Sequence, residues 1–241
     1  MSDRKRIKFT QISLFDVLLC GRYGGVVSVA EVKALGNMAI ATMDRLDGEM
    51  QMIDGVVYQA CADGRINLPG DDATVPFGTI ADFRPEKELQ IDAVPDYGEF
   101  ERRMRDHFPC TNRPLAIRLT GCFRQMKVRS VRRQEKDGVG LADAARNEAV
   151  FQWDGISGDL VGFRLPEYLR GVNAPGWHLH FMDSERRHGG HVVNFAIDGG
   201  RLYACCAEDY QIRLPGDPDA LTGLELGIDR SAELKRAEAE R

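Results

Sequence analysis

The residue types most capable of chemistry are concentrated in one short segment of the chain. Four of the five histidines lie in Gly176–His191, which reads GWHLHFMDSERRHGGH. Successive side chains of a β-strand point to opposite faces, so His178 and His180 are expected on one face and their apolar neighbours on the other. After a polar turn that ends in glycine, His191 is expected to begin the next strand and to pair beside the first two histidines. His188 belongs to the predicted turn and is expected to face solvent.

Three imidazoles around one point are typical of a catalytic zinc site. Such a site uses three protein ligands and keeps a fourth position for water or substrate, whereas structural zinc sites usually close their shell. The spacing therefore predicts Zn²⁺ held by His178, His180 and His191. Two other interpretations stay open, namely ordinary core or surface histidines, and a binding module that a metal only stabilises.

The composition limits the partners of this site. The chain has 43% hydrophobic and 29% charged residues, as expected for a globular protein, and its formal net charge is −5. Because the basic residues are scattered among acids, a nucleic-acid surface is not expected. We find no apolar stretch typical of a signal peptide or a membrane span, so a cytoplasmic protein with a small-molecule partner is expected. The six cysteines form no C-x-x-C pair and are expected to be free thiols.

Strands and tight turns are expected to position the histidines. A helix is predicted over 13–20, and another over 28–35, where Ser28 and Glu31 have the spacing of a capping box. Asp-Gly pairs predict hairpin turns at 47–48, 54–55 and 63–64 within a strand region that covers 37–68. Later strands are predicted by apolar alternation, and one more helix is predicted at 141–150. The predicted later strands are 115–131, 160–165, 177–182, 191–197 and 202–206.

An internal similarity indicates two related halves. The stretch IDGVVYQACA from Ile53, followed by LPGD, resembles IDGGRLYACCA from Ile197, also followed by LPGD. Together with the residues before it, each copy is predicted to run strand, turn, strand, turn, strand. We therefore expect an α/β chain of the strand-rich α+β type. It would have two related mixed β-sheet or barrel-like halves, a few flanking helices and the zinc site at a β-hairpin. The predicted boundaries are 1–110, 111–228 and a charged tail at 229–241.

Several motifs, in order along the chain, resemble those of the acetolactate decarboxylase family. The zinc motif of that family is similar to GWHLHF at 176–181 followed by GGH at 189–191. The resemblance covers the chain from about Phe9 to Cys206. The other matching stretches are LDGEMQMIDG at 46–55, Tyr58-Gln59, VRSV at 128–131 with Gln134, GDLVGFRLPEY at 158–168 and GVN at 171–173.

This resemblance implies a function and a set of site residues. The function is zinc-dependent decarboxylation of 2-acetolactate, a 2-hydroxy-3-oxo acid, to acetoin and CO₂ through an enediolate stabilised by the metal. The implied zinc ligands are the three histidines named above. The implied catalytic residues are Arg129, Glu49 and a tail glutamate, for which the spacing favours Glu238 over Glu233 or Glu240, and Thr42 is implied to line the site.

The implied roles suit the chemistry of these residues. Loss of CO₂ pushes an electron pair toward the neighbouring ketone, and zinc would act there as a Lewis acid, so no organic cofactor is expected. The planar guanidinium of Arg129 can donate two hydrogen bonds to a carboxylate or a developing oxyanion. Glu49, just after a predicted turn, could deliver the proton that quenches the enediolate.

The alternatives use the same three ligands. One is another zinc lyase or hydrolase that acts on a small oxo acid or ester, and the second is the non-catalytic binding module. The chain also departs from the family after Gln134, where it carries EKDGVG at 135–140 in place of the usual Pro-Tyr pair. The resemblance also implies a homodimer.

Overall fold

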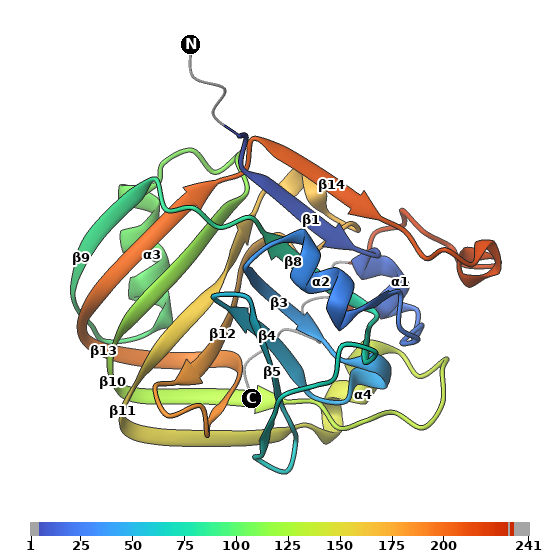
Figure 1. Cartoon of the computed structure of the whole chain (residues 1–241), viewed down its shortest axis with the longest axis horizontal. Helices are drawn as coiled ribbons and strands as arrows, with labels where there is room; N and C mark the ends of the chain where they lie inside the picture. The colour runs from blue at the N-terminus through green and yellow to red at the C-terminus, as the bar shows by residue number, and fades with distance from the viewer. Residues whose placement is uncertain (1–4, 231, 234–241) are drawn as a thin grey trace.

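The computed structural model describes residues 5–230, 232 and 233, and two β-sheets dominate its fold (Figure 1). The first has seven strands in the order β14 (Asp209–Arg213), β1 (Lys8–Ile12), β8 (Phe77–Ala81), β3 (Met38–Thr42), β4 (Glu49–Ile53), β5 (Val56–Ala60) and β6 (Ile66–Asn67). The second has five, in the order β10 (Leu115–Ser130), β11 (Ala149–Leu165), β12 (Gly176–Asp183), β13 (Gly189–Cys206) and β9 (Lys87–Val94). A small separate pair joins β2 (Val27–Ser28) to β7 (Thr74–Val75).

The second sheet closes on itself. β10 pairs with both β11 and β13, and β12 pairs with both of these strands, so the four strands form a closed circuit of pairings. Every pairing in this sheet is antiparallel, whereas the first sheet is mixed because β1 and β14 run parallel. The strand-rich α+β class predicted from the sequence is therefore confirmed.

Short helices cover the sheets. α2 (Val29–Leu35) begins at the predicted capping box, in which the Ser28 side chain accepts from the Glu31 backbone and the Glu31 side chain accepts from the Ser28 backbone. α1 (Phe15–Leu19) and α4 (Leu141–Ala144) are single turns on the side of the molecule where the histidines lie. α3 (Tyr97–His107) packs on the second sheet through Phe100 and Met104 (Figure 1). Four 3₁₀ turns complete the described elements, η1 (Asp44–Leu46), η2 (Ala145–Asn147), η3 (Glu167–Leu169) and η4 (Pro218–Leu221).

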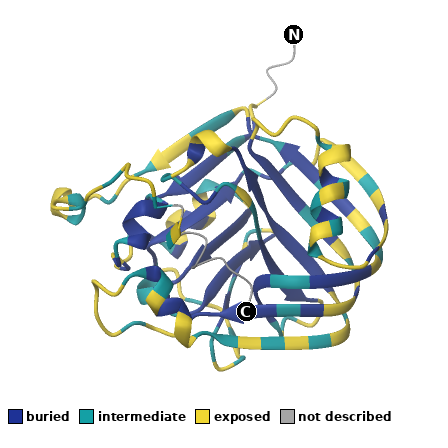
Figure 2. Cartoon of the chain, turned by 180° about the vertical axis from the view of Figure 1, so that it is seen from behind, coloured by how far each residue is buried: buried dark blue, intermediate teal, exposed yellow. Residues whose placement is uncertain are grey.

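Two main apolar cores hold the sheets in place, one between the second sheet and α3 and the other between the two sheets. Phe123, Phe181 and Phe195 from the second sheet meet α3 in one core, with ring centroids 5.1 and 5.7 Å apart in the two pairs that Phe123 forms. Phe9 of the first sheet and Phe163 of the second make an edge contact at 5.4 Å in the core between the sheets. Exposed residues gather on the outer long strands and on the outside of α3, while the strands in the middle are buried (Figure 2). The side of β12 opposite the histidines is thus locked by aromatic packing.

Several sequence predictions are confirmed, and others are wrong in specific places. Asp54 and Gly55, both with positive φ, form the predicted two-residue turn between β4 and β5. The turn predicted after Ile197 is wrong, because β13 continues through it with a register irregularity against β10. The helix predicted over 141–150 ends at Asn147, since β11 already begins at Ala149. The sequence pattern did not predict α3, β1, β2, β7, β8, β9, β14 or the first half of β11.

The two sheets do not correspond to the two halves expected from the internal similarity, because each half contributes a strand to the sheet of the other. β9, which lies before the boundary predicted at 110, belongs to the second sheet, and β14, which lies after it, belongs to the first. The boundaries themselves stay a prediction.

Two simpler expectations can also be compared with the structure. All six cysteines are free, as predicted. Among the described residues, no helix has both the length and the apolar character needed to cross a bilayer.

Candidate active site

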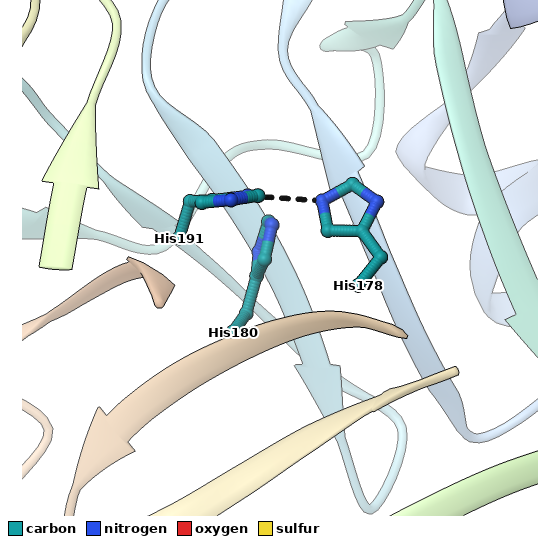
Figure 3. A group of neighbouring side chains, drawn as sticks. All are labelled: His178, His180 and His191. Atoms are coloured by element: carbon teal, nitrogen blue, oxygen red, sulfur yellow. Dashed lines mark hydrogen bonds between the residues drawn. The ribbon is translucent and has the colours of Figure 1, made fainter. Parts of the chain in front are cut away.

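The hairpin of β12 and β13 brings three histidines together (Figure 3). His178 and His180 project from the same face of β12, and His191 lies directly opposite His180 in the antiparallel pairing. Leu179, between the first two, points to the other side and joins the aromatic core around α3. His188 lies in the connecting turn, where its side chain is 41% exposed and contacts Asp183. The strand alternation predicted from the sequence therefore describes the arrangement correctly.

The three imidazoles are close enough to bind one ion. A ligand nitrogen from each of His178, His180 and His191 lies within 4.8 Å of the other two. The ring centroids are 4.8 to 5.5 Å apart, and His178 Nε2 lies 3.0 Å from His191 Nδ1 (Figure 3). Nitrogen donors in this number suit zinc and related transition metals.

His180 shows most clearly that the cluster suits a metal. Its Nδ1 donates a hydrogen bond to the Met50 carbonyl oxygen at 3.0 Å, which leaves the lone pair on Nε2. Within the described part of the chain, that fully buried Nε2 has no hydrogen-bond partner. A ring nitrogen fixed by a backbone carbonyl, with the other nitrogen free to coordinate, is the usual arrangement of a metal-bound histidine. The residues present thus fit a bound metal.

His180 and His191 are also held in the neutral form that coordination requires. Burial, reinforced by the neighbouring His178 and Arg129, holds the pKa of His180 well below its usual value. Burial and the charge of Arg129 likewise hold the pKa of His191 well below its usual value. Protonation of these two imidazoles therefore does not compete with a metal near neutral pH.

Arg129 lies beside this cluster because of strand register. It stands opposite His191 in the pairing of β10 and β13, and its Nη2 donates to His191 Nε2 at 3.3 Å. The Arg129 side chain is only 9% exposed, and its Nη1 contacts Glu148 Oε2 at 3.4 Å. The guanidinium therefore presents a largely buried positive charge at the edge of the histidine cluster.

The first sheet supplies Glu49 and Thr42 from the facing side. They stand opposite each other in the pairing of β4 and β3, and Glu49 Oε2 lies 3.7 Å from His180 Nε2. The Thr42 hydroxyl donates to the Gly48 carbonyl oxygen at 3.0 Å, which ties it to the turn before Glu49. Both side chains are largely buried. The two sheets thus contribute a carboxylate and the histidines to one place.

These residues line a pocket with one polar and one apolar side. Thr42, Glu49, Arg129, His178 and His191 form the polar side. The apolar side was not predicted, and it comes from α1, α4, η1, β8 and the residue after β10. Its large side chains are Phe15, Leu18, Leu46, Phe77, Val131 and Leu141.

Close packing around the histidines explains two glycines. A Cβ on Gly189 would lie 2.6 Å from the Phe181 carbonyl oxygen, and one on Gly190 would lie 2.7 Å from the Arg129 carbonyl oxygen. Gly190 also has a φ of 149°, which side chains disfavour. Because these two residues lack a Cβ atom, the start of β13 can lie close to both β12 and β10.

The tail residues fall largely outside the described part of the chain. Glu238 and Glu240 lie outside the described residues. Glu233 is described, and it forms an ion pair with Arg230 at 3.2 Å. The segment 135–140, where the chain departs from the family pattern, hydrogen bonds to the loop after α1. Tyr23 donates to the Val139 carbonyl oxygen there at 2.5 Å.

Glu148 was missed by sequence reasoning, although a signal existed. Residues Arg129 and Val150 stand opposite each other in the pairing of β10 and β11. A correct prediction of this long hairpin would have placed Glu148 next to the arginine.

Comparisons with known proteins agree with this geometry. Residues 9–226 match the model of the family described as alpha-acetolactate decarboxylase. The chain is similar to alpha-acetolactate decarboxylases of Methanosarcina mazei, with 37% identity over 95% of this chain and 79% of the relative, and of Bacillus licheniformis, with 35% identity over 90% and 86%. The crystal structure of alpha-acetolactate decarboxylase from Bacillus subtilis strain 168 superposes with a TM-score of 0.92, at 29% identity over 97% of this chain and 100% of that one.

The family match covers both sheets and all the described site residues. The enzyme class expected from the sequence, a carboxy-lyase, is the class of these similar proteins. This chain therefore belongs to the alpha-acetolactate decarboxylase family.

Proposed function

We propose that this enzyme decarboxylates 2-acetolactate to acetoin and CO₂ and that a zinc ion held by His178, His180 and His191 is required. The observation that carries the proposal is the fully buried Nε2 of His180, which has no hydrogen-bond partner among the described residues and lies within a cluster of three imidazoles. The family membership supports the reaction, and the donor set supports the metal. When bound, zinc would supply a Lewis acid for the charge that develops on the substrate oxygens.

Arg129 is proposed to bind and orient the substrate carboxylate. Its guanidinium is buried at the pocket wall, where a carboxylate gains more from charge-assisted hydrogen bonds than it would in water. The carbon–carbon bond to the carboxylate then breaks, and its electron pair moves toward the neighbouring ketone to give an enediolate. Arg129 also provides positive charge close to this developing anion.

Glu49 is proposed to deliver the proton that completes the reaction. The carbon that loses CO₂ must gain one proton to give acetoin, and Glu49 lines the pocket. A donor held on a single side of the substrate would fix the configuration of the product. Thr42 would shape the wall beside Glu49, and Glu238 is kept as a second acid proposed from the family resemblance.

The apolar side of the pocket suits the small alkyl groups of the substrate. Phe15, Leu18 and Leu141 offer no hydrogen-bond partners and exclude water from the reacting atoms. We also propose that the protein is cytoplasmic, from its sequence, and a homodimer, from the family resemblance. Sedimentation of the purified protein tests the oligomeric state.

The test is to incubate zinc-loaded protein with racemic 2-acetolactate and to measure acetoin and CO₂. Formation of both in equal amounts supports the proposed reaction. Hydrolysis of activated esters without acetoin would instead indicate the zinc hydrolase alternative. Zinc binding with neither activity would indicate a binding module.

A further inference from the structure

Glu148 and His191 each contact one terminal nitrogen of the Arg129 guanidinium. Nη1 contacts Glu148 Oε2 at 3.4 Å, and Nη2 donates to His191 Nε2 at 3.3 Å. Because the guanidinium is planar and rigid, a contact that holds Nη1 restricts the directions in which Nη2 can point. The contact with Glu148 therefore restricts how Arg129 faces the histidine cluster.

Because the Arg129–Glu148 ion pair is buried, loss of either partner is expected to be costly. The side chains of Arg129 and Glu148 are 9% and 7% exposed. Charges so far removed from water need a partner of opposite sign in good geometry, and loss of one partner leaves the other uncompensated. Glu148 thus neutralises a cation that also lies close to three imidazoles and to a proposed divalent metal.

Among the described residues, the carboxylates of Glu49 and Glu148 are buried near the site and come from different elements. Glu49 comes from the first sheet and lies 3.7 Å from His180 Nε2. Glu148 lies at the end of η2, immediately before β11, and contacts the arginine. The segment that carries Glu148 also carries Leu141 of the apolar pocket wall.

We propose that Glu148 is a positioning residue, which orients Arg129 for the substrate carboxylate without touching the substrate. This inference rests on the proposed role of Arg129. Loss of the Glu148 charge is expected to leave zinc binding unchanged. It should weaken substrate binding because the guanidinium loses its fixed direction.

The experiment compares Glu148→Gln with Asp154→Asn in the zinc-loaded full-length protein. Asp154 is an exposed acid on β11, the strand that follows Glu148, so its substitution makes the same charge change away from the pocket. We expect Glu148→Gln to raise the KM for 2-acetolactate about 10-fold, with a smaller effect on kcat and full zinc content. Glu148→Asp should recover part of the loss, and Asp154→Asn should behave as the wild type.

A double-substitution cycle separates positioning from a general structural role. If Glu148 acts through Arg129, Glu148→Gln should have no further effect on kcat/KM in an Arg129→Lys background. Equal losses in both backgrounds would overturn the proposal, as would an unchanged KM in Glu148→Gln. Thermal unfolding of each variant shows whether a loss reflects misfolding, and Glu148→Asp then supplies the informative comparison.

A binding measurement keeps this test independent of turnover. The affinity for 2-hydroxyisobutyrate, a 2-hydroxy acid without the 3-oxo group, is measured by calorimetry on the same zinc-loaded proteins. We expect about 10-fold weaker binding in Glu148→Gln than in Asp154→Asn. If the wild type makes no acetoin, the proposed function fails, whereas equal affinities in the two variants overturn the role of Glu148.

Discussion

Arg129 and His191 face each other across the antiparallel strands β10 and β13, with Arg129 Nη2 3.3 Å from His191 Nε2. His191 faces His180 across its other neighbour, β12. Arg129, His191 and His180 thus lie side by side on three neighbouring strands, which places the cation next to two of the three proposed zinc ligands. The pairing of backbone groups sets these distances, so the site is held by the sheet itself rather than by mobile loops.

Removal of one imidazole is expected to abolish metal binding. His178→Ala leaves two nitrogen donors, which is too few for the proposed zinc site, so zinc content and acetoin formation should both be lost. Metal analysis of the dialysed protein checks the first effect directly. His188→Ala is the matched control, because that histidine lies in the turn with its side chain 41% exposed, and it should keep its zinc.

Removal of the buried cation is expected to impair the reaction without loss of metal. Arg129→Ala should lower kcat/KM by about 100-fold or more, because truncation of a buried, charge-bearing donor typically costs this much. Steady-state kinetics beside zinc analysis provide the measurement. A variant with full zinc and normal kcat/KM would remove Arg129 from the proposed mechanism.

Substitution of Glu49 on β4 is expected to affect acetoin formation more than substrate binding. Glu49→Gln keeps the size of the side chain but cannot deliver a proton as readily, so kcat should fall about 100-fold with little change in KM. Chiral chromatography should show a loss of enantiomeric purity in the remaining acetoin. Normal turnover and a single enantiomer would assign the proton to another group.

The metal-free protein is expected to lose stability as the pH falls below the usual histidine pKa of 6.5. The pKa of His180 and of His191 lies well below that value in the folded state, so the unfolded chain binds more protons in this window. The free energy of unfolding therefore rises with pH below 6.5 and should fall by about 1 kcal/mol for each of these histidines between pH 7.5 and 5.5.

Urea unfolding of chelator-treated protein at the two pH values measures this difference. Substitution of the exposed His107 by Gln should leave the difference in place, whereas His180→Gln should reduce it. Equal stability at both pH values would show that the two buried histidines are not held neutral by the fold.

The histidine cluster was predictable because it depends on local rules. Strand alternation placed His178 and His180 on one face, and a short hairpin placed His191 beside them. The position of Arg129 required the register of two long strands with irregularities between them, which the local pattern does not contain. Its proximity to the cluster was therefore known from family resemblance alone.

The missed elements have identifiable physical causes. α3 has the sequence YGEFERRMRDH, and only Phe100 and Met104 are buried against the sheet. Two apolar residues among so many charged ones give too weak a periodic pattern to predict a helix. The Asp198-Gly199 pair looks like a turn, but long-range pairing with β10 and β9 carries β13 through it. The apolar pocket wall joins α1 to α4, which are far apart in the sequence, so only the tertiary fold reveals it.

A zinc titration of the chelator-treated enzyme, with 2-acetolactate as substrate, tests the proposed metal requirement directly. We predict that acetoin formation is absent without metal, returns in proportion to added zinc and reaches a plateau near one ion per chain. Undiminished acetoin formation by protein shown to contain no metal would contradict the central claim that the three histidines work through a bound ion.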